Sequence, residues 1–379
     1  MHGKVVMSKL MKAIGLMSGT SLDGIDVALI ETDGEDHVVR GPARTFPYDD
    51  TMRRMLINAL ADARDLRSRD ERPGSLAEAE RALTEQHAVA VAQFLKDTGV
   101  ERSSIEVIGF HGQTVLHKPE RGLTVQLGLG DLLANFTRRP VVYDLRAADV
   151  EAGGEGAPLV PAYHRALAAK LPQRPIAVVN VGGVANLTWI GRDRTLIAFD
   201  TGPGNALIND WMLKKAGAFL DSAGATAAQG TVDEEILRTL LSHDYFAEMP
   251  PKSLDRNTFP TDVADGLSIE DGAATLTAFT ARSIAKAREH LPVEPELWVI
   301  AGGGRRNRTI MRMIAEQVLH AVVPAEAVGL DGDSMEAEAW AYLAVRSIRG
   351  LPITFPGTTG VSEPMSGGLR VDPTAHVIH

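Results

Sequence analysis

Asp200 is the residue whose position in this sequence most favours a chemical role. It directly follows the apolar segment 196–199, which predicts a strand, so its carboxylate is expected at the strand's carboxyl end, where α/β sheets place their ligands. A carboxylate there can act as a general base toward water or a sugar hydroxyl, or hold a metal ion through water. The alternative is an aspartate that caps the turn before the next helix. On the same evidence Asn205 is expected at a helix start and Asp210 on a surface.

Three glycine-rich turns beside predicted strands are candidates for binding a polyphosphate. They span residues 18–24, 200–205 and 302–304. Glycine lets backbone N–H groups approach phosphate oxygens without a Cβ in the way. None of the turns has the P-loop or dinucleotide-binding signature, and each one alone is more simply an ordinary tight turn. Together they favour a nucleotide-dependent enzyme that acts on a polar substrate.

Several other polar residues allow both a binding role and a structural one. Asp23 and Asp26 could orient a phosphate or a hydrated Mg²⁺ ion, or form an Asx turn. His111 follows the predicted strand 107–110 and could reach a ligand, although a lone histidine there is more often structural. Glu336 stands near a predicted helix start, where a carboxylate also complements the helix dipole.

Two loops add further candidates for substrate contact. The glycine-rich segment 153–158 is either a plain linker or a substrate-binding loop. Lys252 and Arg256 could meet an anionic group, and a solvated loop is the equal alternative.

Composition and charge exclude several classes of protein. The chain has 379 residues, which favours two domains, and its hydrophobic (44%) and charged (23%) fractions are those of a globular protein. A net charge of −10 argues against a chain that coats nucleic acid or anionic lipid. The lack of cysteine excludes disulfides, zinc–thiolate sites and iron–sulfur clusters. Because no uncharged apolar run approaches the roughly 18 residues of a membrane span, we expect a soluble, cytoplasmic protein.

The first half of the chain predicts a hairpin followed by a helix and short strands. The hairpin strands are 13–17 and 25–31, with the first glycine turn between them. Ser75 and Glu78 fit a capping box for a helix that Gly99 closes. Further strands are expected at 107–110, 123–127 and 141–145.

The second half begins in the same way, which indicates an internal duplication. Strands are expected at 176–181, 185–190, 196–199 and 297–300, and helices from 206, over 268–290 with Ser268 and Asp271 at its start, and over 307–318 and 334–349. Such alternation predicts an α/β protein of two related halves with a ligand cleft. The expected domains are 1–145 with about 346–379, and 146–345.

The segment 15–26, GLMSGTSLDGID, resembles the opening motif of the anhydro-N-acetylmuramic acid kinase family. Six more motifs follow in the family's order: HGQT at 111–114, GAPLVPA at 156–162, NVGG at 180–183, FDTGPGN at 199–205, PKS at 251–253 and GGG at 302–304. The resemblance covers the chain from about 13 to 345. It implies the two-domain, ribonuclease H-like duplicated fold of the acetate and sugar kinase, Hsp70 and actin superfamily, with ATP in an interdomain cleft.

The resemblance also implies a reaction and its residues. The family uses ATP and water to open the 1,6-anhydro ring of anhydro-N-acetylmuramic acid and to phosphorylate O6. Asp200 matches the catalytic base, and Glu336 a glutamate that helps to hold the sugar or the water. ATP and its phosphates are assigned to Gly19, Thr20, Ser21, Leu22, Asp23, Gly24, Ile25, Asp26, Gly182, Gly183, Gly202, Gly204, Asn205, Gly302, Gly303 and Gly304. The sugar is assigned to His111, Gln113, Gly156, Ala157, Pro158 and Lys252, and Mg²⁺ is implied with no residue named as its ligand.

Two residues depart from the family pattern. Glu155 stands where glutamine is expected and Asp255 where glycine is expected, which bears on sugar contacts rather than on phosphoryl transfer. The rival enzyme is an ordinary sugar kinase that phosphorylates a free hydroxyl without hydrolysis. A sugar-responsive regulator is disfavoured because the phosphate hairpin lies close to the N-terminus and cysteine is absent. A homodimer is expected from the resemblance.

Overall fold

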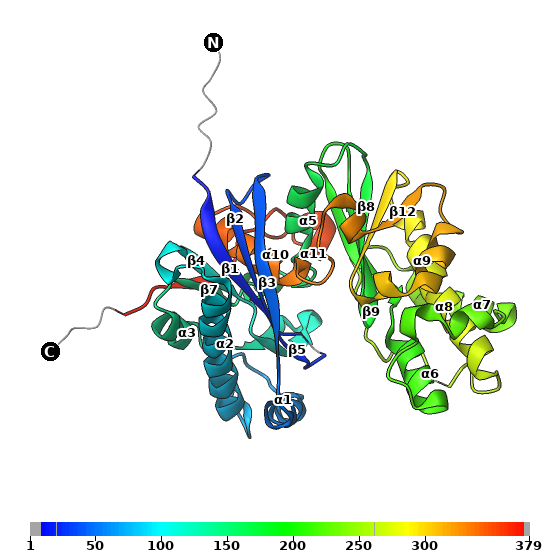
Figure 1. Cartoon of the computed structure of the whole chain (residues 1–379), viewed down its shortest axis with the longest axis horizontal. Coiled ribbons are helices and arrows are strands. Elements are labelled where there is room, and N and C mark those ends of the chain that lie inside the picture. The colour runs from blue at the N-terminus through cyan, green and yellow to red at the C-terminus, as the bar shows by residue number, and fades with distance from the viewer. Residues whose placement is uncertain (1–8, 20, 261, 375–379) are drawn as a thin grey trace, which may run out of the picture. The chain divides into compact units, whose positions relative to one another are not determined.

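The computed structural model describes residues 9–19, 21–260 and 262–374. The chain divides into two compact units: unit 1 is Met1–Leu167 with Ser334–His379, and unit 2 is Ala168–Asp333. Both are mixed α/β (Figure 1). These divisions differ from the expected boundaries near 145 and 345. The helix of residues 335–348 packs on the sheet of unit 1, so the chain returns to unit 1 before that helix rather than at its end.

Unit 1 is built on a six-stranded sheet of order β13-β7-β4-β1-β2-β3. Its strands are β1 Met11–Met17, β2 Gly24–Thr32, β3 Val38–Pro47, β4 Val107–Phe110, β7 Val141–Tyr143 and β13 Leu369–Val371. A separate hairpin pairs β5 Gln113–Lys118 with β6 Leu123–Leu127. The helices are α1 Asp50–Asp62, α2 Leu76–Thr98, α3 Gly130–Thr137, α4 Ala147–Glu151, α5 Pro161–Ala168, α10 Met335–Ile348 and α11 Pro356–Thr359.

Side chains that alternate along the strands of unit 1 show which helices pack on each face of its sheet. Ile14 and Leu16 pack in one core with residues of α1, α2 and α3. Gly15 lies between them in sequence and faces α10, because successive side chains of a strand point to opposite faces. The sheet is therefore covered on both sides.

Unit 2 is built on a five-stranded sheet of order β10-β9-β8-β11-β12. Its strands are β8 Ile176–Val181, β9 Val184–Ile190, β10 Leu196–Pro203, β11 Leu297–Ala301 and β12 Ala321–Pro324. Its helices are α6 Ala206–Ala216, α7 Glu234–Leu241, α8 Ile269–Lys286 and α9 Arg308–Ala315. Its core includes the buried rings of Trp211, Phe279 and Trp298. Short 3₁₀ helices in the two units are 102–104, 119–121, 222–224, 227–229, 244–247, 287–290, 303–306 and 325–328.

The two sheets share one topology. In each sheet the first three strands along the chain form an antiparallel meander. Two later strands are added next to the first strand and run parallel to it. The resulting orders are β3-β2-β1-β4-β7 in unit 1 and β10-β9-β8-β11-β12 in unit 2. This is the ribonuclease H-like order, present twice. The expected duplicated α/β fold is thereby confirmed.

Most expected elements are present, with three instructive differences. The strand expected at 141–145 ends at Tyr143 because Asp144 adopts a φ of 54°. The capping box at Ser75 is wrong: its Oγ donates to Asp62 Oδ2 at 2.9 Å instead of capping the helix. By contrast, Ser268 Oγ accepts from Asp271 N at 3.1 Å as expected, and Gly99 closes α2 with a φ of 68°. Strands β3, β5, β12 and β13 and helices α1, α3, α4, α5, α7 and α11 were not expected.

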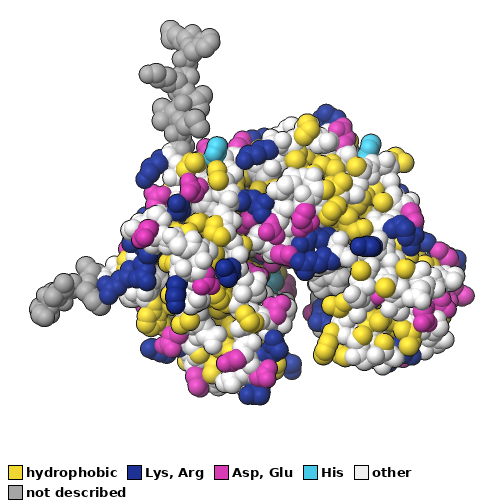
Figure 2. Space-filling model, viewed as in Figure 1, with side chains coloured by type: hydrophobic (Ala, Val, Ile, Leu, Met, Phe, Trp, Pro, Cys, Tyr) yellow, Lys and Arg dark blue, Asp and Glu magenta, His cyan; other side chains and the backbone are white. Residues whose placement is uncertain are grey.

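The surface carries both signs of charge. On the face shown in Figure 2, acidic and basic side chains are interspersed rather than gathered into one field. No helix among the described residues is both long and apolar enough to cross a membrane.

Candidate active site

Asp200 lies near the carboxyl end of β10, as expected, at an irregularity in the strand. The register with β9 shifts between Asp200 and Gly202. The Asp200 backbone N–H donates to Lys252 O at 3.1 Å, its carbonyl accepts from the Tyr245 hydroxyl, and its Oδ2 accepts from Leu254 N at 2.8 Å. Burial raises the pKa of Asp200 to about 7, and the Leu254 N–H opposes that rise. A carboxyl group that titrates near neutral pH is suited to general base catalysis.

Lys252 lies beside Asp200 through its backbone, while its ammonium group points to other partners. Its Nζ donates to Tyr245 O at 2.9 Å, and it lies 3.3 Å from His290 Nε2 and 4.6 Å from the centre of the Tyr245 ring. Burial lowers the pKa of Lys252. Arg256 instead forms an exposed ion pair with Asp210 at 2.9 Å, as a solvated loop would.

The glycine turns of unit 2 meet at the edge of the sheet that carries Asp200. Strands β8, β10 and β11 run in the same direction, so the turns that follow them share one edge. Asn205 N donates to Gly182 O at 2.7 Å, and Gly204 N to Gly183 O at 2.9 Å. A Cβ on Gly302, whose φ is 69°, would lie 2.2 Å from Asn180 Oδ1. Glycine is thus required by close packing at Gly302, and the N–H groups of Gly182, Gly204, Asn205 and Gly302 donate to backbone carbonyls within or beside these turns.

Asn205 begins α6, as expected, but among the described residues its side chain caps no N–H of that helix. Its Nδ2 donates instead to Val181 O at 3.0 Å. The amide therefore fastens the 202–205 turn to the end of β8.

In unit 1 the first glycine turn connects β1 to β2. Leu22 adopts a φ of 55°, and Leu22 N donates to Gly19 O at 3.2 Å. Asp23 accepts from Ser21 Oγ at 2.8 Å, and Asp26 from Thr45 Oγ1 at 2.5 Å. The first of these carboxylate bonds joins two side chains within the turn, and the second joins β2 to β3. Neither is the bond of an Asx turn, in which the carboxylate accepts from a backbone N–H.

Other residues assigned to this turn differ in what they can offer a ligand. Ile25 is buried in the core, and a Cβ on Gly24 would lie 2.4 Å from Phe46 O in β3. A Cβ on Gly19 would have no neighbour closer than Ser21 Oγ at 3.6 Å, so the backbone of Gly19 is the accessible part. Thr20 lies outside the described residues.

His111 follows β4 and is held as a neutral ring. Its Nδ1 lies 3.1 Å from Ser18 O and must donate to it, so Nε2 accepts from Arg146 Nη2 at 3.2 Å. Burial, and then the Arg146 charge, lower the pKa of His111 to about 3. Both ring nitrogens are used, so His111 orients Arg146 rather than transferring protons.

Arg146 is the site residue that sequence reasoning missed. Its hydrogen bonds go to neutral groups, the His111 ring and Gly156 O at 2.8 Å, and its guanidinium lies 5.3 Å from the Trp340 ring centre. Burial lowers its pKa to about 10, and the charge of Glu336 opposes that fall. It is a desolvated cation, still protonated at neutral pH, and such a cation favours an anionic ligand. Its place after β7 is the signal that could have found it.

The segment 153–158 is an ordered loop. Asp149 fixes it by accepting from Gly156 N at 2.6 Å and from Thr359 Oγ1 at 2.6 Å. Ala157 and Pro158 follow and are partly exposed. Burial raises the pKa of the Glu155 carboxyl, which makes this departure from the family pattern easier to protonate.

Gln113 is fully buried at the start of β5, and no described residue hydrogen-bonds its Oε1. Its role in sugar binding stays a prediction.

Glu336 occupies the first turn of α10, which lies unusually close to the sheet. A Cβ on Gly15 would lie 1.8 Å from Ala337 O, and one on Gly109 would lie 2.0 Å from Trp340 O. Glycine in β1 and β4 therefore lets the helix backbone rest on the strands. That contact brings Glu336 within electrostatic range of Arg146.

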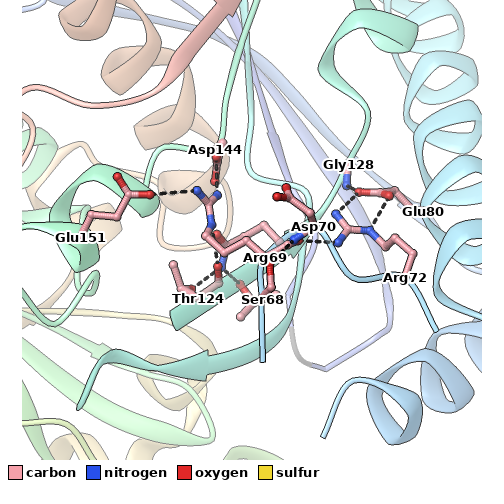
Figure 3. A network of polar contacts seen from close by, with 11 residues as sticks. Ser68, Arg69, Asp70, Arg72, Glu80, Thr124, Gly128, Asp144 and Glu151 are labelled. Carbon is pink, nitrogen blue, oxygen red and sulfur yellow. Dashed lines mark hydrogen bonds and ion pairs between the residues drawn. The ribbon is translucent and has the colours of Figure 1, made fainter. Parts of the chain in front are cut away.

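A cavity of about 330 Å³ in unit 1 borders His111 and Gly112. Figure 3 shows the ion pairs along its wall: Arg69 pairs with Asp144 and, at 3.3 Å, with Glu151. Arg72 pairs with Glu80 at 2.7 Å. Because carboxylates neutralise both arginines, this wall suits a neutral polar group better than a phosphate.

Residues 11–371 match the family model of anhydro-N-acetylmuramic acid kinase. The chain belongs to this family. A relative named anhydro-N-acetylmuramic acid kinase from Rhodopseudomonas palustris is 54% identical over 96% of this chain and all of its own length. Relatives of the same name from Methylobacterium nodulans and Brucella canis are 52% and 50% identical, over 96% and 97% of this chain and their full lengths.

One solved structure with a similar fold is only remotely related to this member of the anhydro-N-acetylmuramic acid kinase family. An activator of 2-hydroxyisocaproyl-CoA dehydratase from Clostridium difficile is 13% identical, with a TM-score of 0.46 over 89% of this chain and 96% of its own. A likeness of this degree says nothing about function. Family membership therefore depends on sequence, and it agrees with the motif order from 15–26 to 302–304.

Proposed function

We propose that this chain opens the 1,6-anhydro ring of anhydro-N-acetylmuramic acid with water and phosphorylates O6 from ATP, giving N-acetylmuramic acid 6-phosphate and ADP. The observation that carries the proposal is Asp200. It is a carboxyl group with a pKa of about 7, at the sheet edge where the glycine turns of unit 2 meet. Family membership over residues 11–371 supplies the reaction class.

In the proposed mechanism the carboxylate of Asp200 takes a proton from water as the water oxygen attacks C1. The C1–O6 bond breaks, and its electron pair stays on O6. O6 then attacks the γ-phosphorus, and the bond to the ADP oxygen breaks. The Leu254 N–H orients the carboxylate of Asp200 by donating to its Oδ2, and the Tyr245 hydroxyl holds the backbone by donating to its carbonyl.

Arg146 is proposed to bind the lactyl carboxylate, the one anionic group of the sugar. It is a desolvated guanidinium, bonded to the neutral His111 ring and Gly156 O, with donors left for a carboxylate. Glu336 is proposed to hold a sugar hydroxyl or the water, as the resemblance implies. Its negative charge near Arg146 opposes the fall in the pKa of that guanidinium that burial causes.

ATP is proposed to use main-chain N–H groups of the turn after β1 and of the glycine turns of unit 2. Mg²⁺ prefers phosphate oxygens, waters and one or two carboxylates, so Asp23 at the exposed turn fits it as a single ligand from the chain. When bound, the ion would neutralise charge on the transferred phosphoryl group. The described residues contain no cluster of three or more His, Asp or Glu side chains that would hold a metal ion by themselves. A cytoplasmic location and a homodimer belong to the same proposal.

The test is ADP release with Mg-ATP and the anhydro sugar in ¹⁸O-labelled water, followed by mass analysis of the product. One ¹⁸O at C1, above the background of authentic product incubated for the same time, supports coupled hydrolysis and phosphorylation. Asp210→Asn, a surface aspartate paired with Arg256, is the control for Asp200→Asn. Release of ADP only with free sugars would reassign the chain to the ordinary sugar kinases.

A further inference from the structure

Glu338 is a buried carboxylate of α10 for which the proposed reaction has no use. Only 1% of the residue is exposed. Ser334 Oγ and Arg40 Nε donate to its Oε1 at 2.9 and 2.8 Å, and the Tyr163 hydroxyl donates to its Oε2 at 2.8 Å. Both oxygens are therefore satisfied, which is what a buried charge requires.

The three donors come from different parts of unit 1. Ser334 precedes α10, Arg40 lies on β3 and Tyr163 lies on α5. Hydrogen bonds to an ionised carboxylate are shorter and stronger than bonds between neutral groups. Glu338 thus fastens the first turn of α10 to two elements that are distant in sequence.

This fastening replaces the usual helix cap. Among the described residues, the Ser334 side chain accepts from no backbone N–H of α10, although serine at this position normally does. Its hydroxyl donates to Glu338 instead. The orientation of the first turn is therefore set by the carboxylate and its partners.

Glu336 lies two residues before Glu338 in the same turn. Residues that are two positions apart on a helix are separated by about 200° of rotation, so the side chains of Glu336 and Glu338 point to opposite sides of α10. Contacts of Gly15 and Gly109 with the helix backbone set the depth of α10 on the sheet. The bonds of Glu338 resist rotation of the helix about its own axis.

We propose that Glu338 is a positioning residue that fixes the direction of Glu336 through the first turn of α10. The inference rests on the proposed function, because it assumes that Glu336 contacts the sugar or the water. By this inference Arg40 and Tyr163 help to position Glu336 through their hydrogen bonds to Glu338, although neither residue stands in a family motif.

The test compares Tyr163→Phe with Tyr342→Phe. Each removes one hydroxyl that makes a 2.8 Å hydrogen bond in unit 1, but Tyr342 lies further along α10 and donates to Glu35 O. We expect Tyr163→Phe to lower kcat about 3- to 10-fold with an unchanged KM for ATP, because only part of the free energy of one hydrogen bond to a charged group is transmitted to Glu336 through the first turn. Tyr342→Phe should keep kcat within about twofold of the wild type. Glu338→Gln should lower kcat at least as much as Tyr163→Phe.

Hydrogen exchange of the Glu338 amide, which donates to Ser334 O at 2.9 Å and so closes the first turn, gives a second readout that does not depend on activity. It should be faster in Tyr163→Phe and unchanged in Tyr342→Phe. Equal loss of kcat in both tyrosine variants, or unchanged kcat and exchange in Tyr163→Phe and Glu338→Gln, would overturn the assignment of Glu338. If the wild type does not turn over the anhydro sugar, the proposed function fails instead, and the exchange comparison still decides whether Glu338 fixes the first turn.

Discussion

At the carboxyl edge of its sheet, unit 1 carries His111 and Arg146, whereas unit 2 carries Asp200 and Lys252. Burial acts on both pairs. It lowers the pKa of His111 to about 3 and that of Arg146 to about 10, and it raises the pKa of Asp200 to about 7. Unit 1 thus holds a fixed cation beside a neutral ring, and unit 2 holds a carboxyl group that can exchange a proton at neutral pH. In the proposed function, the same topology therefore binds an anion in unit 1 and supplies a general base in unit 2.

The third strands of the two sheets differ in the same way. β3 is mostly exposed, while β10 is mostly buried and interrupted at Asp200. Burial of β10 is what desolvates the carboxyl group. A residue at the matching place in β3 would stay in contact with water and keep an ordinary pKa.

The largest expected effect is that of Asp200→Asn. Loss of a general base should lower kcat by about 100- to 10,000-fold, with ATP affinity nearly unchanged. Because the raised pKa means that burial disfavours the charged form, the variant should also unfold at a higher temperature at pH 8, and the gain should shrink at pH 5, where wild-type Asp200 is protonated. Steady-state kinetics and thermal melts at both pH values check this. Near-normal turnover would remove Asp200 from the mechanism.

Arg146→Met should break the anion site of unit 1. We expect KM for the anhydro sugar to rise by roughly 10- to 100-fold, the cost of one or two hydrogen bonds to a charged group. The comparison substrate is 1,6-anhydro-N-acetylglucosamine, which lacks the lactyl carboxylate. The wild type should discriminate between the two sugars and the variant should not. If the variant still discriminates, the carboxylate is bound elsewhere.

Gly19→Val should weaken nucleotide binding by about tenfold, because a side chain there would obstruct main-chain N–H donors to phosphate. The fold should be unaffected, since a Cβ at Gly19 has no neighbour closer than 3.6 Å. Gly266→Val, where a Cβ meets nothing within 4 Å, is the matched control in unit 2. Titration with ATP and thermal melts measure both effects. Unchanged affinity in Gly19→Val would show that this turn does not hold the phosphates.

The smallest effect is a difference in acid stability between the units. Burial lowers the pKa of four histidines of unit 1, to about 4 for His87 and His117 and to about 3 for His111 and His164. The unfolded state binds these protons near pH 6.5, so their contribution to stability falls as pH drops from about 6.5 toward 4, by about 1–2 kcal/mol per histidine at pH 5 and by less for the more exposed His117. Protonation of Asp200 in unit 2 acts in the opposite direction. Hydrogen exchange is measured at pH 7.5 and 5, with rates corrected for their intrinsic pH dependence. The protection of backbone amides should fall more in unit 1 than in unit 2 on going to pH 5. An equal loss of protection in the two units would contradict this prediction.

Regular elements were predictable where burial imposes a clear pattern. The strands 107–110, 123–127 and 176–181 were predicted with their observed bounds, because apolar β-branched runs between turn residues have few alternatives. β3 was missed because its exposed face leaves no alternation to detect. The capping box at Ser75 failed because Asp62, 13 residues earlier, takes the hydroxyl.

The sequence by itself determined the family, the glycine turns and the aspartate at the end of 196–199, since each depends on residue type and local order. Only the tertiary structure decided that His111 supports Arg146, that Arg40 and Tyr163 meet Glu338, and that Asp200 titrates near neutral pH. Arg40 and Glu338 are 298 positions apart, so the spacing of neighbouring residues carries no information about their contact. A pKa depends on how completely distant segments exclude water, which is fixed only when they pack.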